Sequence, residues 1–212
     1  MVGCYTQALT GVQPHGPYAL AGYSYGAAIA FEIAKRLKER GEAVQLVSID
    51  GTPTIGDKAA PLPKSHCAVI LAFFLGLIGR QEKESLPVEL AALSPGEDFH
   101  ARIFERASSA RLAELGLDLE RFAHWARVSV HMVRIGEAYE PQGQVQGLTV
   151  LHAAPLSGTQ QEWLEKLTAW ERFSRTPPAY VQLPGEHHSL LDAPHLTVLH
   201  AALRRALGEA PG

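Results

Sequence analysis

The stretch Tyr-Ala-Leu-Ala-Gly-Tyr-Ser-Tyr-Gly, residues 18–26, decides how this chain folds. Residues Tyr18 to Ala21 predict a short buried strand. The next segment, Gly26 to Arg40, is apolar on nearly all sides in its first half and charged in its second, which predicts a helix that emerges into solvent. Val44 to Ile49 predicts a second buried strand. A strand, a helix and a strand in this order predict a right-handed crossover in a parallel sheet, and therefore an α/β protein.

The alternation of strands and helices stops after the second strand and resumes near residue 148. From about Thr54 to Tyr139 no strand signal appears, and an interval of roughly 80 residues is longer than an ordinary loop. It predicts several helices, including Cys67 to Ile78 and Leu119 to Tyr139, with breaks at Pro87, Pro95-Gly96 and Gly116. The elements expected around this interval are a weak helix at Val2 to Val12, strands at Leu148 to His152 and Tyr180 to Leu183, and helices at Gln160 to Phe173 and Leu196 to Leu207. The prediction is a single domain over residues 1–212, with a core from 1–56 and 140–212 and a helical insertion at about 57–139.

Composition excludes several other classes of protein. The 212 residues are 46% hydrophobic and 19% charged, with a net charge of -3 and no basic cluster longer than Lys35-Arg36, so nucleic acid is not an expected partner. Two distant cysteines, Cys4 and Cys67, give no disulfide framework or zinc cage. No signal peptide is recognised, and the longest apolar run is shorter than the roughly 20 residues that span a bilayer. We therefore expect a soluble, cytoplasmic protein without a membrane span.

The sequence Gly22-Tyr23-Ser24-Tyr25-Gly26 is a G-x-S-x-G motif at a strand-to-helix turn. Such a turn forces the serine into a strained backbone conformation and exposes its hydroxyl. We expect a glycine two residues to either side, because a Cβ atom there would clash between strand and helix. Ser24 is the predicted nucleophile. The N–H groups of the following helix stabilise developing negative charge, so the Tyr25 N–H is the predicted oxyanion donor.

A serine nucleophile needs a histidine base, and the base needs an acid that orients it. Residues Gly185 to Ser189, after the last strand, contain His187 and His188, and the residues alone leave open which of the two faces Ser24. Together with Glu186, the two histidines could also be interpreted as a metal site, although no H-x-x-x-H spacing supports that interpretation. The acid is Asp50 by elimination, because the strand that begins at Leu148 is followed by no carboxylate before Glu162. A turn aspartate before Gly51 is the alternative reading of Asp50.

Three segments resemble the thioesterase domain of animal fatty acid synthases and related polyketide synthases, an α/β-hydrolase. These segments are Gly16 to Glu32, Ile49 to Pro53 and Gly185 to Leu191. In that family the serine of the turn, the aspartate of D-G-[ST]-P and the histidine of G-[DE]-H form the catalytic triad. The resemblance therefore implies that Ser24, Asp50 and His187 are the catalytic residues, and it selects His187 over His188.

The resemblance also implies a function. The chain would release a fatty acyl or polyketide chain from the phosphopantetheine arm of an acyl carrier protein, through an acyl-serine intermediate. It would need no metal and no cofactor of its own, and the helical insertion would be a lid that lines the acyl groove. Two alternatives are a stand-alone carboxylesterase or lipase, and a truncated, catalytically silent module that binds a carrier protein or an acyl chain.

One departure from the resemblance concerns the amino-terminal part. Only 23 residues precede Ser24, whereas an α/β-hydrolase has several strands upstream, and the loop after one of them gives a second oxyanion donor. The N-terminal strands are thus apparently missing. We expect a slow enzyme that self-associates through an unpaired sheet edge and gains activity when upstream residues are restored.

Overall fold

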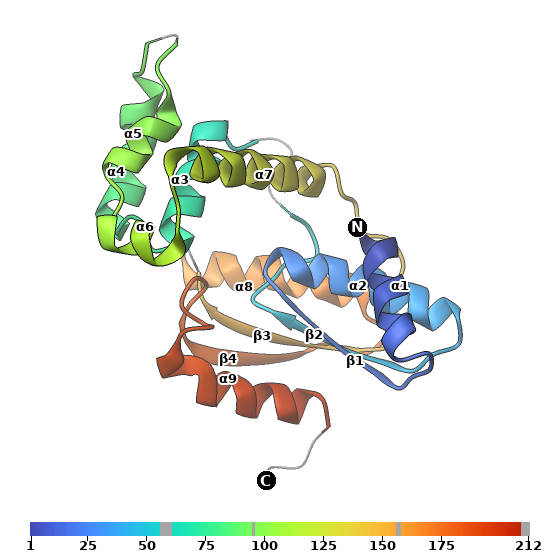
Figure 1. The fold of residues 1–212 in the computed structure, drawn as a ribbon. Helices are drawn as coiled ribbons and strands as arrows, with labels where there is room; N and C mark the ends of the chain where they lie inside the picture. The colour runs from blue at the N-terminus through green and yellow to red at the C-terminus, as the bar shows by residue number, and fades with distance from the viewer. Residues whose placement is uncertain (56–60, 95, 156–157, 209–212) are drawn as a thin grey trace. The chain divides into compact units, whose positions relative to one another are not determined.

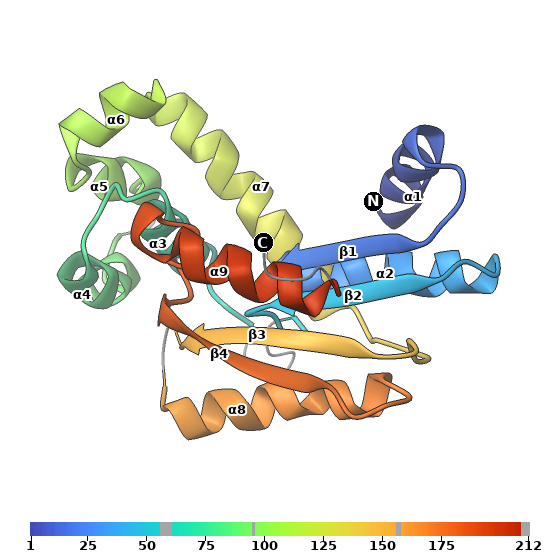
Figure 2. The ribbon, with the colours of Figure 1, turned by 90° about the horizontal axis from the view of Figure 1, so that it is seen from below.

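Four strands form one parallel sheet in the computed structural model, which describes residues 1–55, 61–94, 96–155 and 158–208 (Figure 1). They are β1 (Tyr18–Tyr23), β2 (Val44–Ile49), β3 (Leu148–Ala154) and β4 (Ala179–Glu186). The strands lie side by side in the order β1-β2-β3-β4, as Figure 2 shows, and all three pairings are parallel. The predicted α/β class and parallel sheet are confirmed, and three of the four strands extend further than the sequence pattern predicted.

Helices cover both faces of this sheet. The first compact unit of the chain, Met1–Ile55 with Glu140–Gly212, contains α1 (Val2–Val12), α2 (Tyr25–Glu39), α8 (Gln160–Thr168), the 3₁₀ helix η1 (Ala169–Phe173) and α9 (Ala193–Ala206). Helices α2 and α8 lie on one face and α9 on the other (Figure 1). Phe31, Leu46 and Trp170 belong to the core on the α2 and α8 face, and Val47, Leu151 and Leu199 to the core on the α9 face. Because strand side chains alternate, neighbouring residues of β2 serve opposite cores.

The second compact unit, Gly56–Tyr139, is helical in its described residues. It contains α3 (Lys64–Phe74), α4 (Arg80–Ala91), α5 (Phe99–Glu105), α6 (Ser109–Leu115) and α7 (Leu119–Glu137). The predicted break at Gly116 is confirmed, because Gly116 ends α6. The break predicted at Pro87 is wrong, since Pro87 lies inside α4, where the buried side chains of Leu86 and Leu90 anchor the helix on both sides of it. Pro95 lies outside the described residues, and the lid role of this unit stays a prediction.

No described helix combines the length and the apolar character that crossing a bilayer requires.

The turn between β1 and α2 is built on the absence of a side chain at Gly22. A Cβ atom added at Gly22 would lie 2.2 Å from the Gly26 carbonyl oxygen and 2.7 Å from the Ala27 Cα, distances that no folded backbone accommodates. The expectation that Gly26 also avoids a clash is wrong, because a Cβ atom there would meet nothing within 4 Å. The close approach is therefore one-sided: the strand residue must be glycine so that the helix can begin directly above it.

This asymmetry gives a matched pair of variants. We expect Gly22→Ala to lower the free energy of unfolding by about 2 kcal/mol or more, because the strand and helix must separate to admit a methyl group. Gly26→Ala should change it by no more than about 1 kcal/mol, since alanine in a helix is intrinsically favoured over glycine. Urea unfolding of both variants checks this, and equal losses of stability would contradict the one-sided packing.

Candidate active site

Ser24 sits in a strained turn at the carboxyl end of β1. Its backbone has φ 53° and ψ -121°, in the half of conformational space that residues other than glycine rarely adopt. The Ser24 N–H donates to the Ile49 carbonyl oxygen of β2 at 2.8 Å, and the helix α2 begins at the next residue. A non-glycine residue held at positive φ between a strand and a helix is the geometry of a nucleophile elbow.

The structure brings the three predicted site residues together. Ser24 Oγ lies 3.0 Å from His187 Nε2, and His187 Nδ1 lies 2.6 Å from Asp50 Oδ2. All three residues belong to the first compact unit and come from the carboxyl ends of β1, β2 and β4. Carboxyl ends of parallel strands meet at one edge of the sheet, which explains how residues 163 positions apart in the chain become neighbours.

His188, the alternative base, occupies a different position. Its Nδ1 lies 3.5 Å from a carboxylate oxygen of Glu186, whereas the adjacent His187 ring reaches Ser24. The backbone N–H of His187 donates to the Ala154 carbonyl oxygen at the end of β3, and this hydrogen bond holds the His187 backbone against the sheet. The two rings therefore diverge, as expected for neighbours in a turn.

Asp50 is a fully buried carboxylate, with 0% of its surface exposed. It follows β2 with φ 50°, a second strained turn beside that of Ser24, and its N–H donates to the Leu151 carbonyl oxygen. While Oδ2 faces His187, Oδ1 accepts the Ala153 N–H at 2.9 Å and the Trp163 indole N–H at 3.1 Å. The charge is thus satisfied from three directions, as a buried carboxylate requires.

Trp163 and Tyr23 are site residues that sequence reasoning missed. Trp163 lies on α8, 113 positions from Asp50, and no local pattern marks it as a partner of that residue. Tyr23 occupies the variable position before the serine in the motif. Its ring stacks on the His187 ring, with centroids 5.2 Å apart, and its hydroxyl donates to the His187 carbonyl oxygen. Its place directly before Ser24 is the one signal that could have identified it.

The Tyr25 N–H is the first of α2, where a backbone N–H has no carbonyl of a preceding helical turn to donate to, whereas the Ala27 N–H donates to the Ser24 carbonyl oxygen at 3.0 Å. The Tyr25 N–H and the helix dipole favour negative charge next to Ser24. Tyr25 follows Ser24 directly at the start of this helix, and its role as oxyanion donor stays a prediction.

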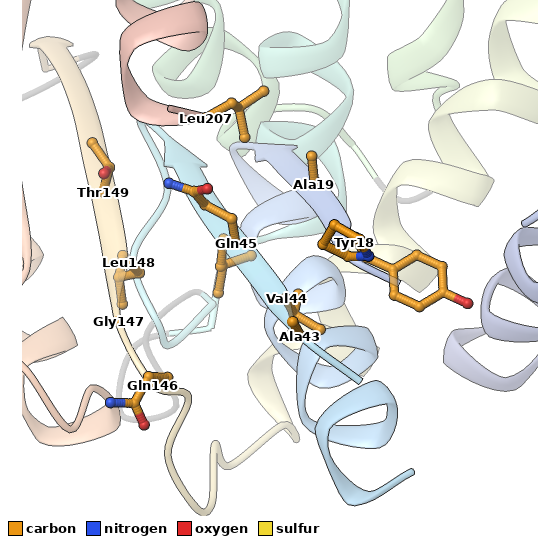
Figure 3. Close-up of a pocket in the computed structure, with 12 residues that line it drawn as sticks. Tyr18, Ala19, Ala43, Val44, Gln45, Gln146, Gly147, Leu148, Thr149 and Leu207 are labelled. Atoms are coloured by element: carbon orange, nitrogen blue, oxygen red, sulfur yellow. The ribbon is translucent and has the colours of Figure 1, made fainter. Parts of the chain in front are cut away.

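A pocket opens at the opposite ends of the strands, where β1, β2 and β3 begin (Figure 3). It is lined by Pro17 to Ala19, Ala43 to Leu46, Gln146 to Thr149, and Leu207. Because none of these residues belongs to the group around Ser24, this pocket is separate from the candidate active site.

Within the described residues, no three His, Cys, Asp or Glu side chains are grouped as ligands for a metal ion.

The pKa of Tyr23 is raised to about 12, because burial disfavours the phenolate and because the nearby carboxylates of Asp50 and Asp192 repel it. An unfolded tyrosine titrates near pH 10, so the neutral Tyr23 side chain contributes fully to stability below that pH. Its contribution is lost as the pH rises from 10 through about 12.

We expect the difference in unfolding free energy between the wild type and Tyr23→Phe to be constant up to about pH 9 and to shrink above pH 10. Urea unfolding between pH 8 and 11.5 measures it, and a difference that stays constant over that range would contradict this account.

The sequence is similar to a known protein family and to several characterised proteins. A sequence model described as Thioesterase domain matches residues 1–86. Atromentin synthetase invA5 of Paxillus involutus is 37% identical over 214 residues, with 100% of this chain and 22% of that protein aligned. Inactive atromentin synthetase invA3 of the same organism is 36% identical over 212 residues, with the same shares aligned. This chain therefore spans about a fifth of the length of these curated relatives.

Solved structures share the fold. The Vlm2 thioesterase domain bound with a dodecadepsipeptide has a TM-score of 0.67 at 24% identity, over 100% of this chain and 76% of that chain. The four-domain nonribosomal peptide synthetase AB3403, bound to AMP and glycine, has a TM-score of 0.75 at 24% identity, over 100% of this chain and 16% of that chain. Among these relatives AB3403 is named a nonribosomal peptide synthetase, and none of those described here is named a fatty acid or polyketide synthase. Residues 1–86, the segment that carries Ser24 and Asp50, match the thioesterase domain family, and the whole chain shares the fold of solved thioesterase domains.

Proposed function

We propose that this chain is the product-releasing thioesterase domain of a carrier-based synthetase. Its substrate is an acyl group joined by a thioester to the phosphopantetheine arm of a carrier domain, and Ser24 takes over that acyl group. The observation that carries the proposal is the continuous hydrogen-bonded line from Ser24 Oγ through the His187 ring to Asp50, with separations of 3.0 Å and 2.6 Å. This order of nucleophile, base and orienting acid is suited to acyl transfer.

In the first half of the proposed reaction, His187 Nε2 takes the proton from Ser24 Oγ as this oxygen attacks the thioester carbonyl carbon. The tetrahedral oxyanion forms next to the start of α2, where the Tyr25 N–H donates to it. The intermediate collapses with cleavage of the C–S bond, and the proton held by His187 passes to the leaving thiol. The products are acyl-Ser24 and the free phosphopantetheine thiol.

In the second half, a hydroxyl group replaces the thiol. Either water or a hydroxyl of the bound acyl group attacks acyl-Ser24, and His187 takes its proton and returns it to Ser24 Oγ. Throughout, Asp50 keeps the N–H of His187 on Nδ1 and stabilises the imidazolium while it exists. The buried position of Asp50 strengthens this stabilisation, because water does not screen the carboxylate.

One relative carries the word inactive in its name, so the proposal needs a test of whether Ser24 is an activated nucleophile. A fluorophosphonate reacts covalently with an activated serine and does not depend on knowing the substrate. We expect one label per chain, on the tryptic peptide that contains Ser24, and none in Ser24→Ala. Mass spectrometry of the labelled protein measures this. Absence of labelling in the folded wild type would instead support a catalytically silent binding module.

The roles of the two other residues follow from their hydrogen bonds. We expect Asp50→Asn to slow turnover by about 10³ to 10⁴-fold, because the amide cannot hold the His187 tautomer or stabilise its cation. His187→Ala should slow it at least as much. His188→Ala is the matched control, because that ring faces Glu186 and should leave the rate within about threefold of the wild type. Steady-state hydrolysis of an acyl-pantetheine thioester measures these rates, and a severe loss in His188→Ala with a mild loss in His187→Ala would reverse the assignment.

A further inference from the structure

Two tryptophans donate their indole N–H groups to adjacent residues at the end of β2. Trp163 Nε1 donates to Asp50 Oδ1 at 3.1 Å, and Trp170 Nε1 donates to the Gly51 carbonyl oxygen at 2.7 Å. Trp163 lies on α8 and Trp170 on the following 3₁₀ helix, and both pack in the same core cluster on one face of the sheet. One tryptophan touches the carboxylate that faces His187, and the other touches the backbone next to it.

The contact with Trp163 restrains the orientation of the Asp50 carboxylate. Oδ2 is engaged with His187, and rotation about the side chain would move Oδ1 away from both of its donors, Ala153 N and Trp163 Nε1. The Ala153 N–H is part of β3 and cannot follow such a rotation. Of the two donors to Oδ1, only the Trp163 indole N–H belongs to a side chain. It is therefore the hydrogen bond that a substitution can remove.

The position of Trp163 is itself well determined. The first turn of α8 is closed by a capping box, in which Thr159 Oγ1 accepts the Glu162 N–H and Glu162 accepts the Thr159 N–H. Trp163 is the next residue, and its ring packs against the core cluster that contains Phe31 and Val150. The capping box fixes the backbone just before Trp163, and the core cluster fixes its ring, so the position of the indole N–H is well determined.

We propose that Trp163 is a positioning residue for the reaction: its indole N–H holds the Asp50 carboxylate in the orientation in which Oδ2 faces His187 Nδ1. The inference rests on the proposed function, because Trp163 acts only through Asp50 and His187 on Ser24. Trp170 has no such role, because its hydrogen bond ends on a backbone carbonyl oxygen.

Two consequences follow from removal of the indole N–H. The carboxylate gains freedom to rotate, so His187 is oriented less well and the activation of Ser24 becomes slower. The carboxylate also loses a donor that offsets part of its charge, so the pH dependence of Ser24 activation changes together with its rate.

Other charged and titratable groups near the pair are Tyr23 from β1, His152 from β3, and Glu186, His188 and Asp192 from the segment around His187. Tyr23, with its pKa raised to about 12, is neutral between pH 5 and 9. Burial lowers the pKa of His152, and the Asp50 carboxylate partly opposes this lowering. None of these groups is altered by a substitution at residue 163 or 170. A difference between the two tryptophan variants therefore isolates the indole contact with Asp50.

The test compares Trp163→Phe with Trp170→Phe in the full chain. Both substitutions remove one indole N–H and keep an aromatic ring. The measurement is the rate constant for fluorophosphonate labelling of Ser24 between pH 5 and 9, with urea unfolding as a check of the fold. We expect Trp163→Phe to lower the maximal rate by about tenfold, as for loss of a hydrogen bond to a charged group, and to shift the midpoint of the pH profile by about half a pH unit or more. Trp170→Phe should lose stability and keep both the rate and the midpoint of the wild type.

If the phenylalanine variant at residue 163 fails to fold, 3-benzothienylalanine at the same position keeps the shape of indole and lacks its N–H, and it should give the same two effects. A rate and midpoint equal to those of Trp170→Phe, or a slower rate with an unchanged midpoint, would overturn the positioning role. A wild type that is not labelled would instead overturn the proposed function itself, so the two failures are distinguishable.

Discussion

The packing of two strained turns against each other is the constraint on which the candidate site depends. Ser24 follows β1 with φ 53°, and Asp50 follows β2 with φ 50°. A Cβ atom at Gly51 would lie 2.4 Å from the Ser24 carbonyl oxygen, so the second turn can approach the first only with glycine there. Hydrogen bonds from Ser24 N to Ile49 and from Asp50 N to Leu151 hold both turns to the neighbouring strands. Backbone strain of this kind persists only where the surrounding structure determines it from several sides.

Much of this arrangement was predictable from local sequence. Residue type and hydrophobic pattern predicted all four strands, and for β2 the predicted bounds, Val44 and Ile49, are those of the structure. The motif around Ser24 and the order of the segments that contain Asp50 and His187 were enough to propose a site. These features are local, or depend only on the rule that parallel strands end at the same edge of a sheet.

What the sequence did not predict depends on contacts between distant segments. Nothing near Trp163 indicates that its indole reaches Asp50, because the approach of α8 to the end of β2 is a consequence of the folded sheet. The error at Pro87 has the same origin, since the helix continues through it with buried leucines on both sides. The error at Gly26 arose because the two glycines of the motif look equivalent in sequence, whereas only Gly22 faces a backbone at close range.

The central claim is that Ser24 accepts an acyl group from a thioester, and the most direct test is to trap that acyl-enzyme. The wild type and Ser24→Ala would be mixed with acyl-pantetheine thioesters, quenched in acid at short times and digested for mass spectrometry. The account predicts one acyl group on the peptide that contains Ser24, which disappears as the substrate is consumed, and no acyl peptide in the variant. Thiol release by Ser24→Ala at the wild-type rate, or an acyl group on another residue such as the exposed Cys4, would contradict it.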